Sequence, residues 1–294
     1  MKKNHISLLF ALIAGFLISS CTKDDDEPVL PTVAFNQTAG YITGNTTAAY
    51  GDTLNFGIIL QSNGADNLVK FEIKANDQVL VDSTINTASF VFNFYAIKSI
   101  ADTEVWAFTA TDIAGNKKTE TITITGNFGA INSYTTILFG AQDNAAVESF
   151  LSLSNNQAVK YFQANAFQNQ DKIDIFCFYE DTPTHQNYMS LGSPGSNITG
   201  VFTGATSPDN YTTKNLTRFY KTTLTAAQFD AIQNDAVILA NYNADESRKK
   251  ASVLTAGDVY AIKIQSGLYG LIKVIAVTGT ETGTLEIAVK IQKQ

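Results

Sequence analysis

The sequence predicts a mostly all-β protein with an antiparallel β-sandwich over residues 32–126 and a second, mainly β domain over residues 134–294 with one or two short helices. Two patterns predict the strands: apolar and polar residues alternate in short runs, and turn residues separate the runs. Length predicts two domains, because the 294 residues less the first 20 leave about 274, more than one core usually supports.

Residues 1–20 have the features of a secretory signal peptide. Lys2 and Lys3 form a positive start, and an almost uninterrupted apolar run follows over residues 6–18. A run of about 13 residues suits a signal sequence, whereas a permanent transmembrane helix needs roughly 18. We therefore expect this segment to be removed from the mature protein.

Two small residues and a cysteine follow the apolar run. Ser19 and Ser20 have the small side chains that signal peptidases require just before the cleavage site, and Cys21 comes directly after them. Ile18-Ser19-Ser20-Cys21 resembles the bacterial lipobox, in which the cysteine is acylated on its sulfur and on its new amino terminus. The resemblance implies that Cys21 is the lipidated first residue, held at a membrane by several acyl chains. The alternative is an ordinary secretory signal followed by a chance cysteine.

Residues 21–31 are predicted to form a short acidic tether. Their adjacent carboxylates repel one another and stay solvated. Cys21 followed by Lys23, Asp24, Asp25 and Asp26 resembles the export signal of surface lipoproteins in glycan-utilising Gram-negative bacteria. The resemblance implies an outer-membrane protein that faces the cell exterior, and a periplasmic orientation is the alternative.

Composition limits the partners. Loss of Lys2 and Lys3 from 20 basic residues leaves 18 against 27 acidic ones, a net charge of −9. A chain this acidic lacks the electrostatic footprint of a nucleic-acid-binding protein. Anionic headgroups would repel it, so the lipid on Cys21 must provide the membrane contact.

The cysteines and histidines limit the chemistry. Apart from Cys21, the only cysteine is Cys177, which we expect to be a small buried hydrophobe, so no disulfide framework is predicted. One histidine, His185, remains after signal removal and cannot build a zinc site with a single thiol. We expect no cofactor and assign no metal site, although calcium at Asp66, Asp112 or Asn116 in the loops of the first domain stays open.

Six alternating runs in residues 32–126 predict the strands of the sandwich. The fifth run continues into the segment Ala107 to Asn116, which with the Thr-rich run after it resembles the final hairpin of bacterial immunoglobulin-like modules, with Gly115 and Asn116 at left-handed turn positions. The resemblance covers about 95 residues and implies an immunoglobulin-like β-sandwich without the usual disulfide. It is nearly silent about function, because this fold hosts many tasks. Trp106 is expected in the core. The predicted strands are 52–58, 69–74, 79–81, 89–94, 104–110 and 119–125.

Residues 127–133 are predicted to be a linker, and residues 134–294 a mainly β domain. Thr225 and Gln228 form a capping box, which predicts a helix that begins there and extends to about Ile232. After a break, the helix is expected to continue toward Ala240. The run Thr217 to Asp230 and the C-terminal strands resemble domains of undescribed function in the same class of surface lipoproteins, which implies no activity. The predicted strands are 134–139, 159–162, 172–179, 188–191, 218–220, 259–264, 269–277 and 284–291.

Aromatic and polar side chains of the second domain suggest a sugar-binding platform. Glycan sites use exposed aromatic faces beside amides and charged groups, although tyrosines in strands more often fill half-buried positions. The candidate residues are Tyr179, Tyr188, Tyr211, Arg218, Tyr220 and Tyr269.

Catalysis has weaker support in the sequence, and we assign no catalytic residue. Ser193-Pro194-Gly195-Ser196 is not a nucleophile elbow, and His185 is the only base available to it. Asp171, Asp174, Glu180 and Asp181 cluster around one predicted strand, but Asp174 and Glu180 lie too far apart for the roughly 5 Å of a retaining glycosidase pair. Acids at strand ends are also common on protein surfaces.

The sequence therefore predicts a non-catalytic, surface-displayed lipoprotein. Its ligand is expected to be an extracellular glycan or a partner of a glycan-uptake complex. The alternatives are a carboxylate-dependent glycoside hydrolase in the second domain and an adhesion or assembly component.

Overall fold

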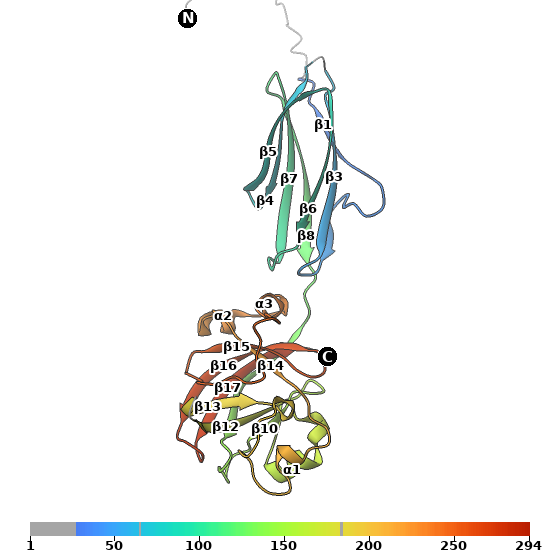
Figure 1. Cartoon of the computed structure of the whole chain (residues 1–294). Helices are drawn as coiled ribbons and strands as arrows, with labels where there is room; N and C mark the ends of the chain where they lie inside the picture. Colours follow the sequence, from blue (N-terminus) through green and yellow to red (C-terminus); the bar gives the residue numbers. More distant parts are fainter. Residues whose placement is uncertain (1–27, 65, 183–184) are drawn as a thin grey trace, which may run out of the picture.

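The computed structural model describes residues 28–64, 66–182 and 185–294 and shows two β domains joined by a short connection (Figure 1). Both domains are built almost entirely of antiparallel strands. The predicted fold class, an immunoglobulin-like β-sandwich followed by a mainly β domain, is confirmed.

The first domain is a sandwich of two sheets. One sheet has the order β1 (Thr32–Phe35), β3 (Thr53–Gln61), β6 (Ser89–Ile97). The other has the order β2 (Thr46–Ala48), β8 (Lys117–Gly126), β7 (Thr103–Asp112), β4 (Leu68–Ala75), β5 (Gln78–Thr87). Among the described residues of this domain, only β2 and β8 pair in parallel, and this strand order is the Greek key of immunoglobulin-like sandwiches.

Aromatic side chains fill the space between these two sheets. Phe56 on β3 contacts Trp106 and Phe108 on β7, with ring centroids 5.0 and 5.2 Å apart. Trp106 is only 3% exposed, as predicted. The alternation of each strand thus places its apolar side chains in one shared core.

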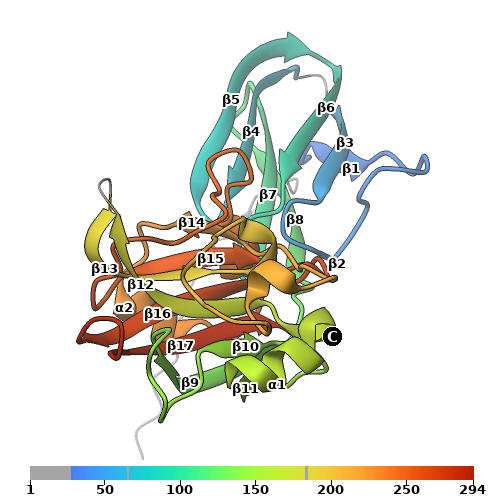
Figure 2. The same ribbon diagram turned by 60° about the horizontal axis from the view of Figure 1, so that its bottom comes forward.

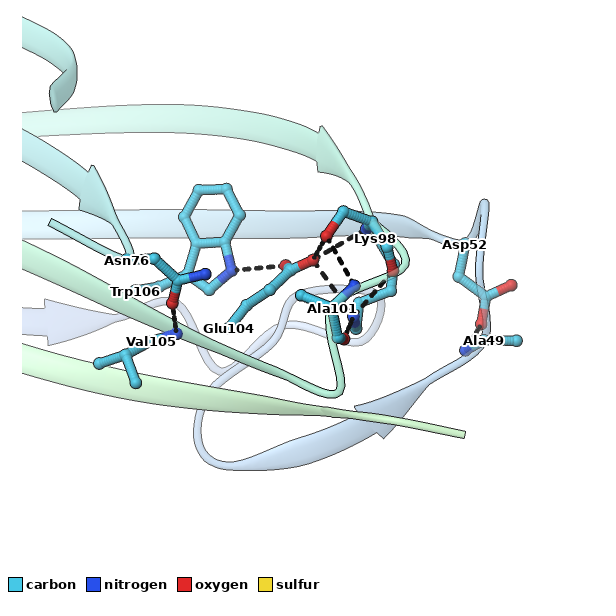
Figure 3. A network of polar contacts seen from close by, with 9 residues as sticks. Ala49, Asp52, Asn76, Lys98, Ala101, Glu104, Val105 and Trp106 are labelled. Carbon is cyan, nitrogen blue, oxygen red and sulfur yellow. Dashed lines mark hydrogen bonds and ion pairs between the residues drawn. The ribbon is translucent and has the colours of Figure 1, made fainter. Parts of the chain in front are cut away.

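A buried ion pair lies at one end of the sandwich, where Lys98 follows β6 and Glu104 lies near the start of β7 (Figure 3). Lys98 Nζ lies 3.2 Å from Glu104 Oε1 and also donates to the carbonyls of Ser99 and Ala101. Glu104 accepts from the Ser99 amide and hydroxyl and from Trp106 Nε1. Burial raises the pKa of Glu104, but these hydrogen bonds outweigh burial and hold it below its ordinary value.

The connection between the domains is held on both sides. The Asn127 amide donates to Ala48 of the sandwich, and the Phe128 ring lies 5.3 Å from Lys98 Nζ. The Gly129 amide donates to the Asp235 carboxylate, 2.6 Å away in the second domain. Only residues 127–130 lie between strands, because β9 (Ile131–Gly140) starts within the predicted linker.

The second domain stacks two antiparallel sheets. The four-stranded sheet has the order β11 (Val159–Tyr161), β10 (Phe150–Ser152), β12 (Ile175–Thr182), β13 (His185–Gly192). The five-stranded sheet has the order β14 (Arg218–Lys221), β15 (Val259–Lys263), β16 (Tyr269–Thr278), β17 (Thr284–Gln292), β9. Cys177 is fully buried in the core between these sheets, as predicted.

Residues 247–254 join the two sheets along one side. Ala251 pairs with Leu191 at the free edge of β13, and Arg248 pairs with Phe219 on β14. Both bridges have two backbone hydrogen bonds, of 2.8 and 2.9 Å for Ala251 and 2.6 and 2.7 Å for Arg248. The segment therefore continues both sheets without forming a regular strand.

Short helices cover the outer faces of both sheets. Helices α2 (Ala226–Ala231) and α3 (Ala236–Ala240) pack on the five-stranded sheet, and α1 (Gln163–Gln168) lies beside β11 (Figure 2). The predicted capping box is present: Thr225 Oγ1 accepts from the Gln228 amide, and Gln228 Oε1 accepts from the Thr225 amide. Lys290 on β17 donates to the carbonyls of Asp230 and Ile232, which fixes the C-terminal end of α2 to the sheet.

The buried ion pair of the first domain predicts a large effect of a small substitution. Glu104→Gln leaves Lys98 buried without its carboxylate and should lower the free energy of unfolding by about 3 kcal/mol. The pKa of Glu104 lies below its ordinary value of 4.5, so its contribution is present above about pH 4.5 and is lost as the pH falls further. Denaturation followed by the fluorescence of Trp106, the only tryptophan, reports this domain alone.

Glu120→Gln is the matched control. Glu120 pairs with Lys118 at the surface, where both side chains are 41% exposed, and such pairs contribute less than about 1 kcal/mol. Equal destabilisation by the two substitutions would contradict the assigned role of Glu104.

Candidate functional site

A groove on the outer side of the four-stranded sheet is the candidate site. It consists of two adjacent cavities with volumes of 620 and 350 Å³ that share Ile198 in their walls. Such volumes fall within the range of small-molecule sites. The larger cavity is lined by Ser196, Asn197, Ile198, Arg248, Lys249, Lys250 and Ser252.

An ion pair between a buried carboxylate and a partly exposed lysine links the walls of the two cavities, because Glu180 lines the smaller one and Lys250 the larger one. Glu180 on β12 is 6% exposed, and its Oε1 accepts from Lys250 Nζ. Its Oε2 accepts from the hydroxyls of Ser190 at 3.0 Å and Ser252 at 3.4 Å. A carboxylate can be buried here because a cation and two hydroxyls replace the water that it loses.

Strand alternation explains why Glu180 points outward. On β12, Phe176, Phe178 and Glu180 face the outer side, whereas Cys177 and Tyr179 face the core between the sheets. Register places Tyr188 of β13 directly opposite Glu180, and therefore on the same face. The Tyr188 side chain is 41% exposed beside the ion pair.

The two ends of the groove carry opposite charge. Arg248 and Lys249 line the larger cavity and are exposed. Asp181 and Glu281 line the smaller cavity together with Glu180. The groove can therefore bind a polar ligand by hydrogen bonds and charge, with Ile198 as an apolar contact.

The six platform residues predicted from sequence do not lie together, which corrects that prediction. Tyr179 and Tyr211 are buried, and the Tyr211 hydroxyl has no hydrogen-bond partner. Only Tyr188 is exposed beside the groove. Arg218, Tyr220 and Tyr269 belong to the other sheet of the domain.

Arg218 and Tyr269 already have partners within the fold. Arg218 Nε donates to Ser247 Oγ at 3.1 Å, and its guanidinium also donates to the Ser247 carbonyl. The Tyr269 ring packs edge-on against Tyr242 and lies 4.9 Å from Lys263 Nζ. These contacts stabilise the five-stranded sheet and give Arg218 a structural role.

The proposed carboxylate pair also fails on geometry. Asp174 precedes β12 and Glu180 lies six residues further along it, which separates them by about 20 Å at roughly 3.3 Å per residue. Glycosidase pairs lie roughly 5 to 10 Å apart. The Asp174 carboxylate instead accepts from the Leu153 amide at 2.7 Å. Ser193, the other candidate, is buried, and its hydroxyl accepts from the Thr217 amide.

Sequence analysis missed most of the groove. Lys250, Ser190 and Ser252 reach Glu180 from segments up to 72 residues away in the chain. The one available signal was Arg248-Lys249-Lys250, the only run of three consecutive basic residues.

The predicted anchor and export residues, Cys21, Lys23, Asp24, Asp25 and Asp26, lie outside the described residues. Within the described ranges, no helix is long and apolar enough to cross a membrane. No group of three or more His, Cys, Asp or Glu side chains in the same ranges is arranged to hold a metal ion.

Comparison with known proteins gives only distant likenesses to solved structures. No protein-family model and no curated protein matches the sequence. A solved structure, described as "Structures of Clostridium thermocellum CbhA fibronectin(III)-like modules", matches with a TM-score of 0.24 and 15% identity. The match covers 34% of this chain and 47% of that one, so this chain spans less than half of that structure's length. No function is inferred from this likeness, and the strand order given above identifies the fold.

Asp174 predicts an unusual dependence of stability on pH. Burial raises its pKa to about 6, and the hydrogen bond from Leu153 opposes this only in part. Between about pH 4 and pH 6 the folded protein binds more protons here than the unfolded chain, so stability falls as the pH rises. Asp174→Asn should remove this slope and raise the free energy of unfolding above pH 7 by about 2 kcal/mol.

Urea unfolding of the second domain, followed by circular dichroism across this pH range, measures the effect. The exposed Asp245, replaced by Asn, is the control and should keep the wild-type slope. A wild-type slope in the Asp174→Asn variant would show that this carboxyl is not responsible.

Proposed function

We propose that this protein is a lipid-anchored, surface-exposed lipoprotein whose second domain binds an extracellular glycan through the groove. The lipobox-like run ending at Cys21 and the export-like segment Lys23 to Asp26 support the location. The observation that carries the binding role is the 620 Å³ cavity, lined by polar and charged side chains beside the ion pair of Lys250 with the buried Glu180.

The first domain acts as a spacer in this proposal. Thr32 pairs with Gln61 at one end of β3, whereas Thr53, at the other end, pairs with Ile97 beside the Lys98 network. Strand β1 thus begins at one end of the sandwich, and the connection to the second domain leaves at the opposite end (Figure 1). The nine residues of β3 span about 30 Å, so the sandwich holds the groove away from the membrane.

The groove suits sugar recognition better than catalysis. Its buried carboxylate, Glu180, is held by Lys250 and by two hydroxyls, and the second carboxylate of the predicted pair lies about 20 Å away along the strand. Hydroxyl groups, an amide from Asn197 and the exposed Tyr188 ring are the groups with which proteins hold sugars. We therefore propose binding without turnover.

The lipid anchor is tested by metabolic labelling with an alkyne fatty acid in the host cell. Wild-type protein should carry the label and Cys21→Ser should carry none, because its side chain lacks the acylated sulfur. Replacing Asp24, Asp25 and Asp26 by Asn is the control, which should keep the label but lose sensitivity to protease added outside intact cells. An unlabelled wild-type protein would contradict the proposed anchor.

Glycan binding is tested on an array with the mature chain carrying Cys21→Ser. Tyr188→Ala should weaken retention about fivefold, since an aromatic contact contributes about 1 kcal/mol. Tyr95→Ala is the matched control, because Tyr95 is 73% exposed on β6 of the first domain and should not affect binding. Absence of retention on every glycan would refute the binding role.

A further inference from the structure

The larger cavity concentrates positive charge in an acidic protein. Arg248, Lys249 and Lys250 follow one another along its wall, and the sequence has no other run of three basic residues. The whole chain carries a net charge of −7. The overall composition of an acidic chain does not explain why three basic residues line one cavity.

Two of these three cations have no carboxylate partner. Lys250 is paired with Glu180, but neither Arg248 nor Lys249 has a carboxylate within 4.0 Å among the described residues. The nearest acids in sequence are Asp245 and Glu246, and Glu246 is turned to Asn243, whose amide donates to it at 3.1 Å. Other lysines, in contrast, form ion pairs with a carboxylate: Lys70, Lys74, Lys118, Lys160, Lys221 and Lys273.

The backbone that carries the cations is fixed from three directions. Arg248 exchanges two hydrogen bonds with Phe219, and Ala251 exchanges two with Leu191. Ser196 also lines the cavity, and its hydroxyl donates to the Lys249 carbonyl over a distance of 2.5 Å. The cations therefore project from an ordered backbone, which lowers the entropy lost when a ligand binds.

We propose that the larger cavity receives the anionic group, a carboxylate or a sulfate, of an acidic sugar. This inference rests on the proposed glycan-binding role and names the class of glycan. The guanidinium of Arg248 can donate two parallel hydrogen bonds to such a group, and Lys249 adds a second charge. Asn197, in the left-handed conformation that asparagine tolerates, and the shared Ile198 lie beside the cations for the hydroxyls and the ring of the sugar.

Calorimetry on the mature chain carrying Cys21→Ser tests this proposal with four probes. An oligogalacturonate supplies carboxylates, a heparin-derived oligosaccharide supplies sulfates, maltohexaose is the neutral sugar, and sodium sulfate is the free anion. At least one acidic oligosaccharide should bind more tightly than maltohexaose and sodium sulfate. The probe that binds identifies which anionic group the cavity accepts.

The double substitution Arg248→Gln with Lys249→Gln locates the site. It should weaken binding of the acidic oligosaccharide about tenfold or more, since one hydrogen bond to a charged group contributes about 1.5 kcal/mol. Lys117→Gln with Lys118→Gln, on β8 of the first domain, changes the net charge equally and should leave binding within about twofold. Equal losses in both variants would show a non-specific charge effect and overturn the proposal.

The remaining outcomes separate this inference from the proposed function. Maltohexaose binding as tightly as the acidic probes, with no effect of the double substitution, would overturn the acidic-sugar inference and leave glycan binding intact. Sodium sulfate binding as tightly as the sulfated oligosaccharide would reduce the site to one for a free anion and overturn the sugar part. No binding of any sugar here or on the array would overturn both.

Discussion

The ion pair between Glu180 and Lys250 is the interaction on which the second domain's candidate site depends. It connects β12 to residues 247–254 across the intervening strand β13, and this segment in turn continues both sheets. Burying the Glu180 carboxylate, which is 6% exposed, would cost several kcal/mol without a paired cation. The ion pair therefore holds residues 247–254 where Lys250 can reach Glu180. Residues 248–252 of this segment form one wall of the larger cavity, and Arg248 and Lys249 line it.

The first domain uses the same physical device for a different purpose. Lys98 and Glu104 are buried together at the end of the sandwich, and Lys98 also contacts the Phe128 ring of the connection. The connection then reaches the second domain through Gly129 and Asp235. The connection is therefore short and is held by contacts to both domains.

Local patterns in the sequence predicted the longer strands but missed the short strands β1, β2 and β10, and they did not show how the sheets meet. The alternation in β3, β4, β6, β7 and β8 and the capping box at Thr225 depend on neighbours within a few residues. Glu180 and Lys250 are 70 residues apart, so no period links them. The tyrosine prediction failed for the same reason: alternation assigns Tyr179 and Tyr188 to faces of their own strands, but it does not show which face another sheet covers. Helix α1 was missed because its six residues show no helical period and its N-cap residue, Phe162, gives no capping signal such as the one at Thr225.

Hydrogen exchange on the mature protein, with and without an acidic oligosaccharide, tests most directly whether this groove is where the ligand binds. The account predicts slower exchange in residues 196–201 and 247–252, which line the two cavities, and unchanged exchange in the sandwich of residues 32–126. Protection confined to the sandwich, or to the face that carries α2 and α3, would contradict it.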